Sequence, residues 1–151
     1  MWYNVRMSGI WILVTFLLGT TVAHVIKLIR AIVSGEVHGI KEVLPVMYRS
    51  GGMPSGHSAS IVAAATLAGL AYGWTSVEFA ILMCVGIDVM YDAVNVRYAV
   101  GEQGMVMNKI LKKVGSDREM VKIVRGHTIK AVLAGMVVGA IVGATMFFIV
   151  V

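Results

Sequence analysis

The chain has 151 residues, of which 58% are hydrophobic and only 14% are charged, and its net charge is +5. Soluble domains average about 45–50% apolar and about 25% charged residues, so this composition argues against a soluble domain and indicates one membrane domain over residues 1–151. The basic residues flank apolar stretches instead of forming one polar basic surface, so nucleic acid is not an expected partner.

Four apolar stretches approach the length of about 20 residues that a helix needs to cross a bilayer core of about 30 Å. In chain order they are Ser8 to Ile26, Ser58 to Trp74, Val77 to Val96 and Thr128 to Val151. We therefore expect an all-α, polytopic membrane helix bundle with about four transmembrane helices.

Two longer polar connections separate these stretches. The connection from Ser34 to Met53 contains several glycines and Pro45, so we expect a loop with at most a short helix. In the connection from Arg97 to Gly126, apolar residues recur at helical spacing among lysines, which predicts an amphipathic interfacial helix lying at the membrane surface. Gly115 breaks that helix, and a second short helix is expected over Asp117 to Arg125.

Threading these spans through a bilayer places all Lys and Arg residues except Arg6 on one side of the membrane. Lys27 and Arg30 reach that side by snorkelling from the end of the first span. The positive-inside rule makes this side cytoplasmic, so we expect a multi-pass protein of the inner or plasma membrane with its C-terminus outside.

The same threading gathers polar residues from distant segments on the cytoplasmic side. Pro54-Ser55-Gly56-His57 has the features of a helix start, where free N–H groups attract phosphate and a glycine allows close approach. His57 would donate a proton there, although the same four residues equally fit a serine-capped helix with an interfacial histidine. The residues gathered at this face are Lys41, Arg49, Ser55, His57, Asp88, Asp92, Arg97 and His127.

The other histidines and the glycines of the last span are expected to be structural. His24 lies within the first span and His38 in a glycine-flanked loop, so we interpret both as structural or solvent-facing residues. Gly135, Gly139 and Gly143 are four residues apart, a spacing that lets membrane helices pack closely, either within one chain or in a homodimer. Four spans are few for an enclosed site, which also favours a homodimer.

Three separated blocks of the sequence are similar to those of a known family. They are Gly51 to Ala59, then Val89 to Ala93 with Val96-Arg97, and finally Gly126-His127-Thr128, with Gly101, Gln103 and Asn108 between the last two. The first block resembles the Pro-Ser-Gly-His signature of the type 2 phosphatidate phosphatase superfamily, which includes the vanadium haloperoxidases. Over residues 40–140 the chain resembles the small, divergent membrane branch of that superfamily.

This resemblance implies a phosphatase that needs neither a metal nor another cofactor. It assigns His127 as the nucleophile that forms a phosphohistidine and His57 as the general acid. The implied phosphate-binding groups are the cations of Lys41, Arg49 and Arg97, the Ser55 side chain and the Gly56 N–H.

The chain also departs from the superfamily pattern. Seven residues, instead of six, separate Lys41 from Arg49, and Ser50 stands where the pattern has proline. Arg97 lies 30 residues before His127 instead of just before it, which leaves Arg118 and Arg125 as rivals for its role.

A second departure concerns the nucleophile itself. The acid that the superfamily places four residues after the nucleophilic histidine is Ala131 here. Because the partner of the second ring nitrogen sets the tautomer of a histidine, we expect Asp92 or Asp88 to orient His127 from the neighbouring span.

The function predicted from the sequence is hydrolysis of a lipid phosphate monoester, of the phosphatidylglycerophosphate or phosphatidate type, on the cytoplasmic face. Three alternatives stay open: a polyprenyl diphosphate phosphatase, a non-catalytic lipid-binding protein of the same fold, and a Mg²⁺-dependent lipid phosphotransferase. The last rests on Asp88 and Asp92, which share a helix face, because intramembrane acids are costly and usually functional. The single cysteine, Cys84, excludes a metal site built from several cysteines.

Overall fold

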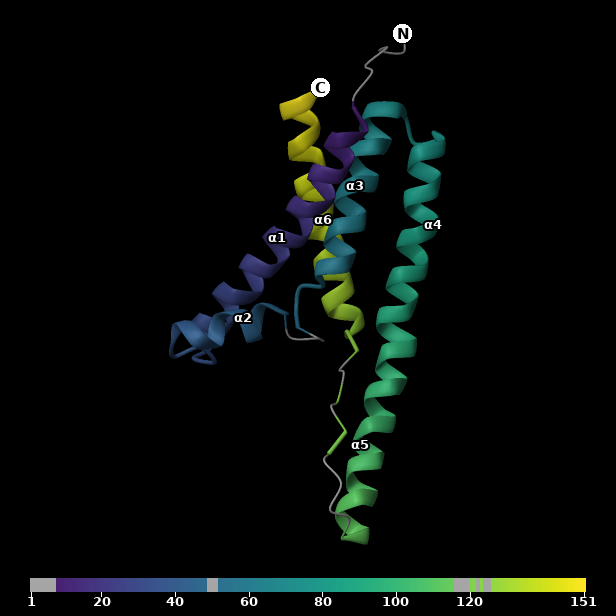
Figure 1. Cartoon of the computed structure of the whole chain (residues 1–151). Helices are drawn as coiled ribbons and strands as arrows, with labels where there is room; N and C mark the ends of the chain where they lie inside the picture. Colours follow the sequence, from purple (N-terminus) through teal and green to yellow (C-terminus); the bar gives the residue numbers. More distant parts are fainter. Residues whose placement is uncertain (1–7, 49–51, 116–119, 122, 124–125) are drawn as a thin grey trace.

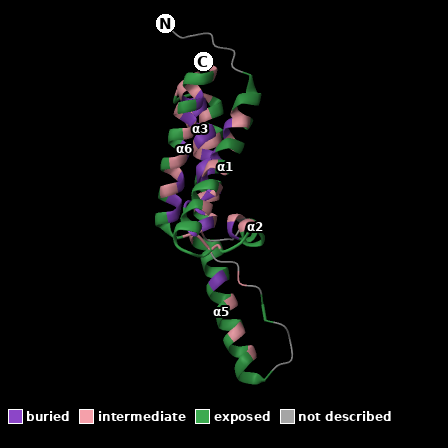
Figure 2. Cartoon of the chain, turned by 90° about the vertical axis from the view of Figure 1, so that its left-hand side faces the viewer, coloured by how far each residue is buried: buried purple, intermediate pink, exposed green. Residues whose placement is uncertain are grey.

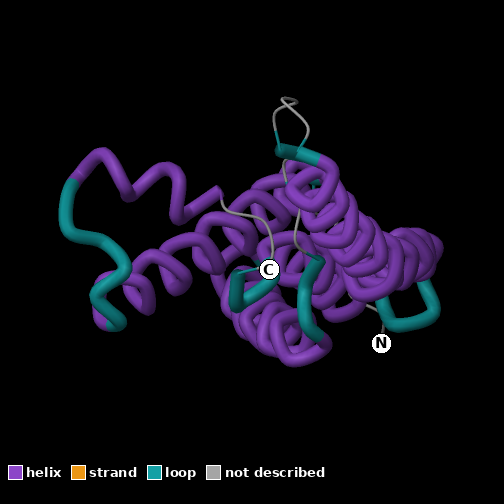
Figure 3. Tube along the Cα trace, turned by 90° about the horizontal axis from the view of Figure 1, so that it is seen from below, coloured by secondary structure: helices purple, strands orange, loops and turns teal. Residues whose placement is uncertain are grey.

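The computed structural model describes residues 8–48, 52–115, 120–121, 123 and 126–151, and these residues form helices and connecting loops without a strand (Figures 1 and 3). This confirms the all-α prediction. The helices in chain order are α1 (Gly9–Val33), α2 (Ile40–Tyr48), α3 (Gly56–Tyr72), α4 (Val77–Tyr91), the π-helical turn η1 (Asp92–Val96), α5 (Arg97–Val114) and α6 (Ile129–Val150).

Hydroxyl side chains define where the four long bundle helices begin. An N-cap hydroxyl accepts a hydrogen bond from a backbone N–H that the helix itself leaves without a partner. At the other end, Gly73 follows α3 with φ of 99° and Gly115 follows α5 with φ of 65°, backbone conformations that favour glycine. The N-caps of α1, α3, α4 and α6 are Ser8, Ser55, Ser76 and Thr128.

Helix α3 is the centre of the bundle and packs against α1, α4 and α6. Its surface consists largely of small residues, and Ala59, Ala63 and Ala64 are fully buried, as Figure 2 shows for the bundle interior. The absence of bulk lets the backbones of neighbouring helices come into contact, the usual arrangement at close interfaces between membrane helices.

The glycines of α6 face this surface of α3. A Cβ atom at Gly135 would lie 2.5 Å from the Ser55 carbonyl oxygen, and Cβ atoms at Gly139 and Gly143 would collide with the carbonyl oxygens of Ala59 and Ala63. The sequence left open whether this glycine series packs within one chain or between two. In the structure it packs within the chain.

Two helices in the described part of the chain, α1 and α6, are long and apolar enough to cross a membrane. Helix α3 has 17 residues, at the lower end of the range of about 17–25 that crosses a bilayer core, and α4 has 15 residues but continues through η1 into α5. The first predicted span ended at Ile26, but α1 continues to Val33, so Lys27 and Arg30 belong to the helix.

The chain runs up and down through the bundle, so the start of α1 and the end of α6 lie at one end of it (Figure 1). The opposite end carries α2, the loop before α3, and α5. Instead of lying flat across this end, α5 continues the direction of α4 and projects beyond the bundle, because η1 joins the two helices without a break. The second short helix predicted from Asp117 falls largely outside the described residues, and Met120, Val121 and Ile123 are not helical.

Replacing Gly139 with alanine tests the α3–α6 contact. The added methyl group meets the backbone of α3, and overpacking of this kind costs about 1–3 kcal/mol, so Gly139→Ala is expected to lower the thermal unfolding midpoint in detergent. Gly9→Ala is the matched control, because a Cβ at Gly9 has no atom within 4 Å. Equal midpoints for the two variants would contradict the close backbone contact.

Candidate functional site

The π-helical turn η1 provides the hydrogen bond that holds His127 in place. The Arg97 N–H donates to the carbonyl of Asp92, five residues back, instead of to that of Ala93 as an α-helix would require. The Ala93 carbonyl instead accepts a hydrogen bond from the His127 N–H, at 3.0 Å. The extra residue of the π turn thus supplies a backbone acceptor to a segment more than 30 residues away in the sequence.

The segment before His127 lies directly against the start of α5. A Cβ atom at Gly126 would lie 2.6 Å from the Tyr98 Cα, so only glycine fits without a shift of the backbone. Further along, the Asn108 side chain donates to the Val121 carbonyl at 2.9 Å and accepts from its N–H at 2.8 Å. These contacts hold Val121 and Gly126 against α5, and His127 follows directly after Gly126.

Ser55 attaches the Pro-Ser-Gly-His segment to the start of α6. Its N–H donates to the Ala131 carbonyl at 2.9 Å, and its hydroxyl accepts from the Ser58 N–H and the Ser58 hydroxyl at 3.4 and 3.0 Å. The Ser55 residue is fully buried. Its side chain therefore caps α3 and faces the protein interior, which agrees with the serine-capped helix that the sequence left open and differs from the phosphate contact that the resemblance implied.

Gly56 and His57 follow as the first two residues of α3. A Cβ atom at Gly56 would lie 3.2 Å from His24 Nε2, so the glycine allows the two helices to approach closely. The first N–H groups of a helix have no partner within the helix, and a helix start favours a negative charge. The N–H groups of Gly56 and His57 are therefore suitable donors to an anion.

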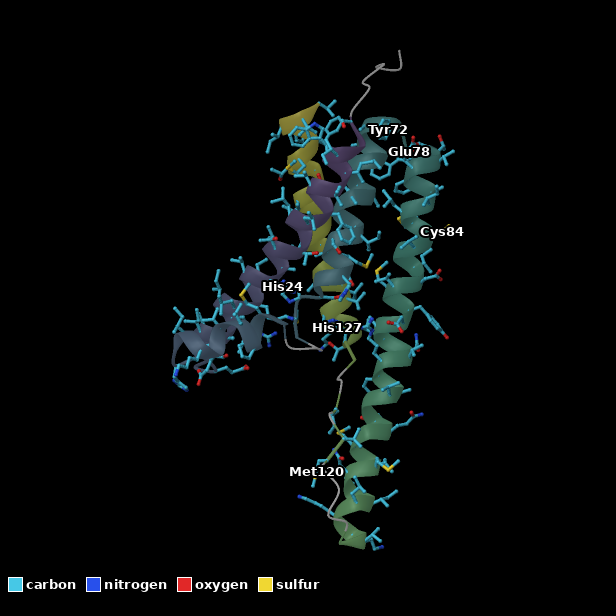
Figure 4. The ribbon with its side chains drawn as sticks, in the orientation of Figure 1. His24, Tyr72, Glu78, Cys84, Met120 and His127 are labelled. Carbon is cyan, nitrogen blue, oxygen red and sulfur yellow. The ribbon has the colours of Figure 1, made fainter. Side chains whose placement is uncertain are left out.

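A cavity of about 510 Å³ unites these elements. It brings together Gly56, His57, Arg97 and His127, all of which the sequence predicted for the site. Figure 4 shows His24 on α1 and His127 below α6 at the same end of the bundle. The lining residues are Phe16, Leu17, Thr20, His24 and Lys27 of α1, Met47 of α2, Gly56, His57 and Ser60 of α3, and Arg97 and His127.

Several other predicted residues lie elsewhere. Lys41 is exposed on α2 and does not line the cavity, and Asp88 is exposed on α4. Asp92 forms an ion pair with Arg97, with 2.6 Å between the Arg97 Nε and a carboxylate oxygen, and no described carboxylate meets His127 Nδ1. The cations Arg49, Arg118 and Arg125 lie outside the described residues.

The ion pair is a further consequence of the π turn. Residues five apart point in different directions on an α-helix, whereas the wider π turn brings positions 92 and 97 to one face. Asp92 thereby holds the guanidinium of Arg97, which lines the cavity.

Two residues that line the cavity, His24 and Lys27, were not predicted for the site from the sequence. Lys27 does not snorkel away from the bundle, because it is only 9% exposed and its ammonium group donates to the Met47 carbonyl at 3.4 Å. His24, interpreted as structural, lines the cavity beside Gly56. The sequence does contain a signal for these two site residues. Thr20, His24 and Lys27 are spaced i, i+4 and i+7, so their polar groups share one face of an apolar helix.

The surroundings of His127 favour a neutral imidazole. Burial of the ring is the main reason that the pKa of His127 lies below its usual value of 6.5. Nearby positive charges lower this pKa further, while the Gly52 backbone acts in the opposite direction by hydrogen bonding to the ring. The charges that contribute are those of Lys27, His57 and Arg97.

The second ring nitrogen has no orienting carboxylate in the described part of the chain. His127 Nδ1 is buried and meets no described atom with hydrogen-bond geometry. Position 131, where the superfamily has an acid, is only 1% exposed, and its backbone is engaged by Ser55 and Thr128. The backbone of His127 is therefore placed by its own N–H and by the packing of Gly126, and the ring is held by its hydrogen bond with the Gly52 backbone.

Among the residues that the structure describes, no three His, Cys, Asp or Glu side chains come close enough together to hold a metal ion.

These features define an all-helical membrane protein with a histidine-rich, cationic cavity at one end of its bundle. A family model described as the divergent PAP2 family matches residues 10–142, and the chain belongs to this family. The chain is also 42% identical over 62 residues to YuiD of Bacillus subtilis (strain 168), described as an uncharacterized membrane protein; the match covers 41% of this chain and 39% of that relative. No solved structure matches the chain.

The pKa of His127 provides a test of the site geometry. Because the Lys27 charge disfavours a protonated His127, Lys27→Met is expected to raise the pKa of His127 toward 6.5. Histidine-selective NMR titration in detergent micelles would measure the shift. Lys41→Met is the matched control, since Lys41 is exposed and does not line the cavity, and an equal shift in both variants would contradict the placement of Lys27.

Proposed function

We propose that this protein is a metal-independent lipid phosphatase that hydrolyses a lipid phosphate monoester through a phosphohistidine intermediate. The observation that carries the proposal is that one cavity, lined by three imidazoles, brings His57 and His127 together with two cations, Lys27 and Arg97. Phosphoryl transfer depends on such positioning and charge stabilisation, with a nucleophile in line and an acid for the leaving group.

In the proposed reaction, His127 attacks phosphorus and the bond to the lipid alcohol oxygen breaks. His57 gives a proton to that oxygen, so the alcohol leaves neutral. Water then attacks the phosphohistidine and gives its proton to His57, which releases inorganic phosphate and regenerates both imidazoles. The lowered pKa of His127 supports the nucleophilic role, because only the neutral ring has a free electron pair.

The negative charge on the transferred phosphoryl group has to be stabilised by cations and hydrogen-bond donors that are fixed in position. We propose Lys27 and Arg97 for this role, together with the N–H groups of Gly56 and His57 at the start of α3. Lys27 takes the place predicted for Lys41, and Asp92 acts by holding Arg97. Arg49 retains its predicted role as an additional cation.

The lipid substrate and its location follow from the membrane character of the chain. Because α3 packs against the two long apolar helices and α4 packs against α3, we propose that all four cross the bilayer. The cation-rich end would then be cytoplasmic, which favours phosphatidylglycerophosphate or phosphatidate over a polyprenyl diphosphate.

One observation favours a second candidate function, a non-catalytic protein that binds phosphate-bearing lipids. His127 Nδ1 has no orienting partner among the described residues, and the position of the expected acid is a buried alanine. A histidine without such a partner would still bind an anion when protonated, but it would be a weaker nucleophile.

Turnover assays distinguish the two candidates. Purified protein in detergent with EDTA is expected to release phosphate from one or more members of a panel of lipid phosphates. His127→Ala should lose at least about 10³-fold in kcat, and His57→Ala about 10²–10⁴-fold, because they remove the nucleophile and the general acid. His38→Ala, an exposed histidine of the α1–α2 loop, is the control.

Each possible result of these assays supports or refutes a different candidate function. Turnover that survives in His127→Ala would refute the nucleophile. Activity that disappears in EDTA and returns with Mg²⁺ would point to the phosphotransferase alternative. Binding of lipid phosphates without turnover would support the non-catalytic protein.

The assignment of Lys27 predicts a second effect on turnover. Lys27→Met removes a cation from the cavity and is expected to lower kcat/KM by about 10²–10³-fold, as for other donors to a developing charge. The acidic limb of the pH–rate profile should also move to higher pH, because the pKa of His127 rises when the Lys27 charge is lost. If kcat/KM fell more in Lys41→Met than in Lys27→Met, Lys41 would again be the phosphate-binding cation, as the resemblance implies.

A further inference from the structure

The cavity that contains the two proposed catalytic histidines is elongated along α1. Phe16, Thr20, His24 and Lys27 line it from one end to the other. Lys27 lies eleven positions after Phe16, which corresponds to about 16 Å at 1.5 Å per residue of an α-helix. This length is about half of the hydrocarbon core of roughly 30 Å, or one leaflet.

The polarity of the lining changes along this length. The cations Lys27 and Arg97 lie at the end near His127, whereas the other end is formed by Phe16 and Leu17 within an apolar part of α1. A site for a small, water-soluble phosphate ester needs only the first end. The lining therefore matches an amphiphile that carries a phosphate on a long apolar chain.

The apolar end is open to the side of the bundle. Leu17 lines the cavity and is nevertheless 55% exposed. In the described part of the chain, α1 and α4 both pack on α3 but make no extensive contact with each other. Neither helix therefore closes the cavity on the side that faces the other helix. A volume of about 510 Å³ lies within the range of roughly 300–1,000 Å³ that is usual for ligand sites.

We propose that this cavity binds one hydrocarbon chain of a phosphate-bearing membrane lipid, which enters sideways along α1 from the leaflet at the cationic end. The chain lies against Phe16, Leu17 and Thr20, and the phosphate reaches Lys27, Arg97 and the imidazoles. The proposal rests on the proposed function of the same site and specifies how its substrate is selected: the lipid chain, as well as the phosphate, is recognised.

Photo-crosslinking tests the proposal without requiring turnover. The full chain is placed in phosphatidylcholine nanodiscs that contain phosphatidic acid with a diazirine in the middle of one chain. Mass spectrometry is expected to find labels concentrated on Phe16, Leu17 and Thr20, at least about fivefold above those from phosphatidylcholine with the same diazirine. Equal labelling by the two lipids, or equal labelling of Leu17 and Leu18, would overturn the proposal.

A pair of adjacent substitutions tests the same groove by kinetics. Leu17→Trp narrows the cavity, whereas Leu18 is 37% exposed on α1 and does not line it, so Leu18→Trp is a control of the same size and type. The ratio of kcat/KM for a long-chain to a short-chain phosphatidic acid is expected to fall about tenfold in Leu17→Trp and to stay unchanged in Leu18→Trp.

The two experiments separate the inference from the proposed function. An unchanged ratio in Leu17→Trp, with normal turnover, would refute the chain site and leave the phosphatase intact. If no lipid phosphate is hydrolysed, the proposed function fails and the crosslinking pattern alone decides whether the cavity holds a lipid chain.

Discussion

The rest of the structure depends on the direct contact between the backbones of α3 and α6. Glycines at three successive turns of α6 leave no side chain between the helices, and the small residues of α3 provide the matching surface. Because the contact extends to Ser55, whose N–H binds the Ala131 carbonyl, it also fixes how the Pro-Ser-Gly-His segment meets the start of α6. His57 and His127 therefore approach each other as a consequence of helix packing, with no direct hydrogen bond between them being required.

The π turn between α4 and α5 is the second determinant of the site. A π turn is less favourable than the α-helix around it, and such turns occur frequently at functional sites. Here it has two structural effects that an α-helix would not provide: the Ala93 carbonyl accepts the His127 N–H, and Asp92 meets Arg97. Through these two contacts α4 and α5 help to position Arg97 and His127, which line a cavity whose other lining residues belong to α1, α2 and α3.

Charge in the cavity is arranged around a buried, neutral imidazole. Lys27 and Arg97 favour a bound anion and at the same time disfavour protonation of His127, so one set of cations serves both effects. The usual way to orient such a ring is a carboxylate on its second nitrogen. In this chain backbone groups take that part instead: the main-chain N–H of His127 donates to the Ala93 carbonyl of η1, Gly126 is packed on Tyr98, and the Gly52 backbone hydrogen-bonds to the ring. The small residue at position 131 is consistent with this arrangement, because its turn of α6 is buried against Ser55.

The sequence by itself determined the all-α class, the approximate positions of the apolar helices and the placement of Gly56, His57, Arg97 and His127 at one end of the bundle. These follow from local signals: long apolar runs, hydroxyl caps, and polar residues at the ends of the runs. Only the tertiary structure decided that Lys27 and His24 line the cavity, that Ser55 is turned inward as a cap, and that Asp92 pairs with Arg97. The physical reason is that these outcomes depend on the rotation of α1 about its axis and on one extra residue in a helical turn, and neither is specified by hydropathy or by the spacing of a motif.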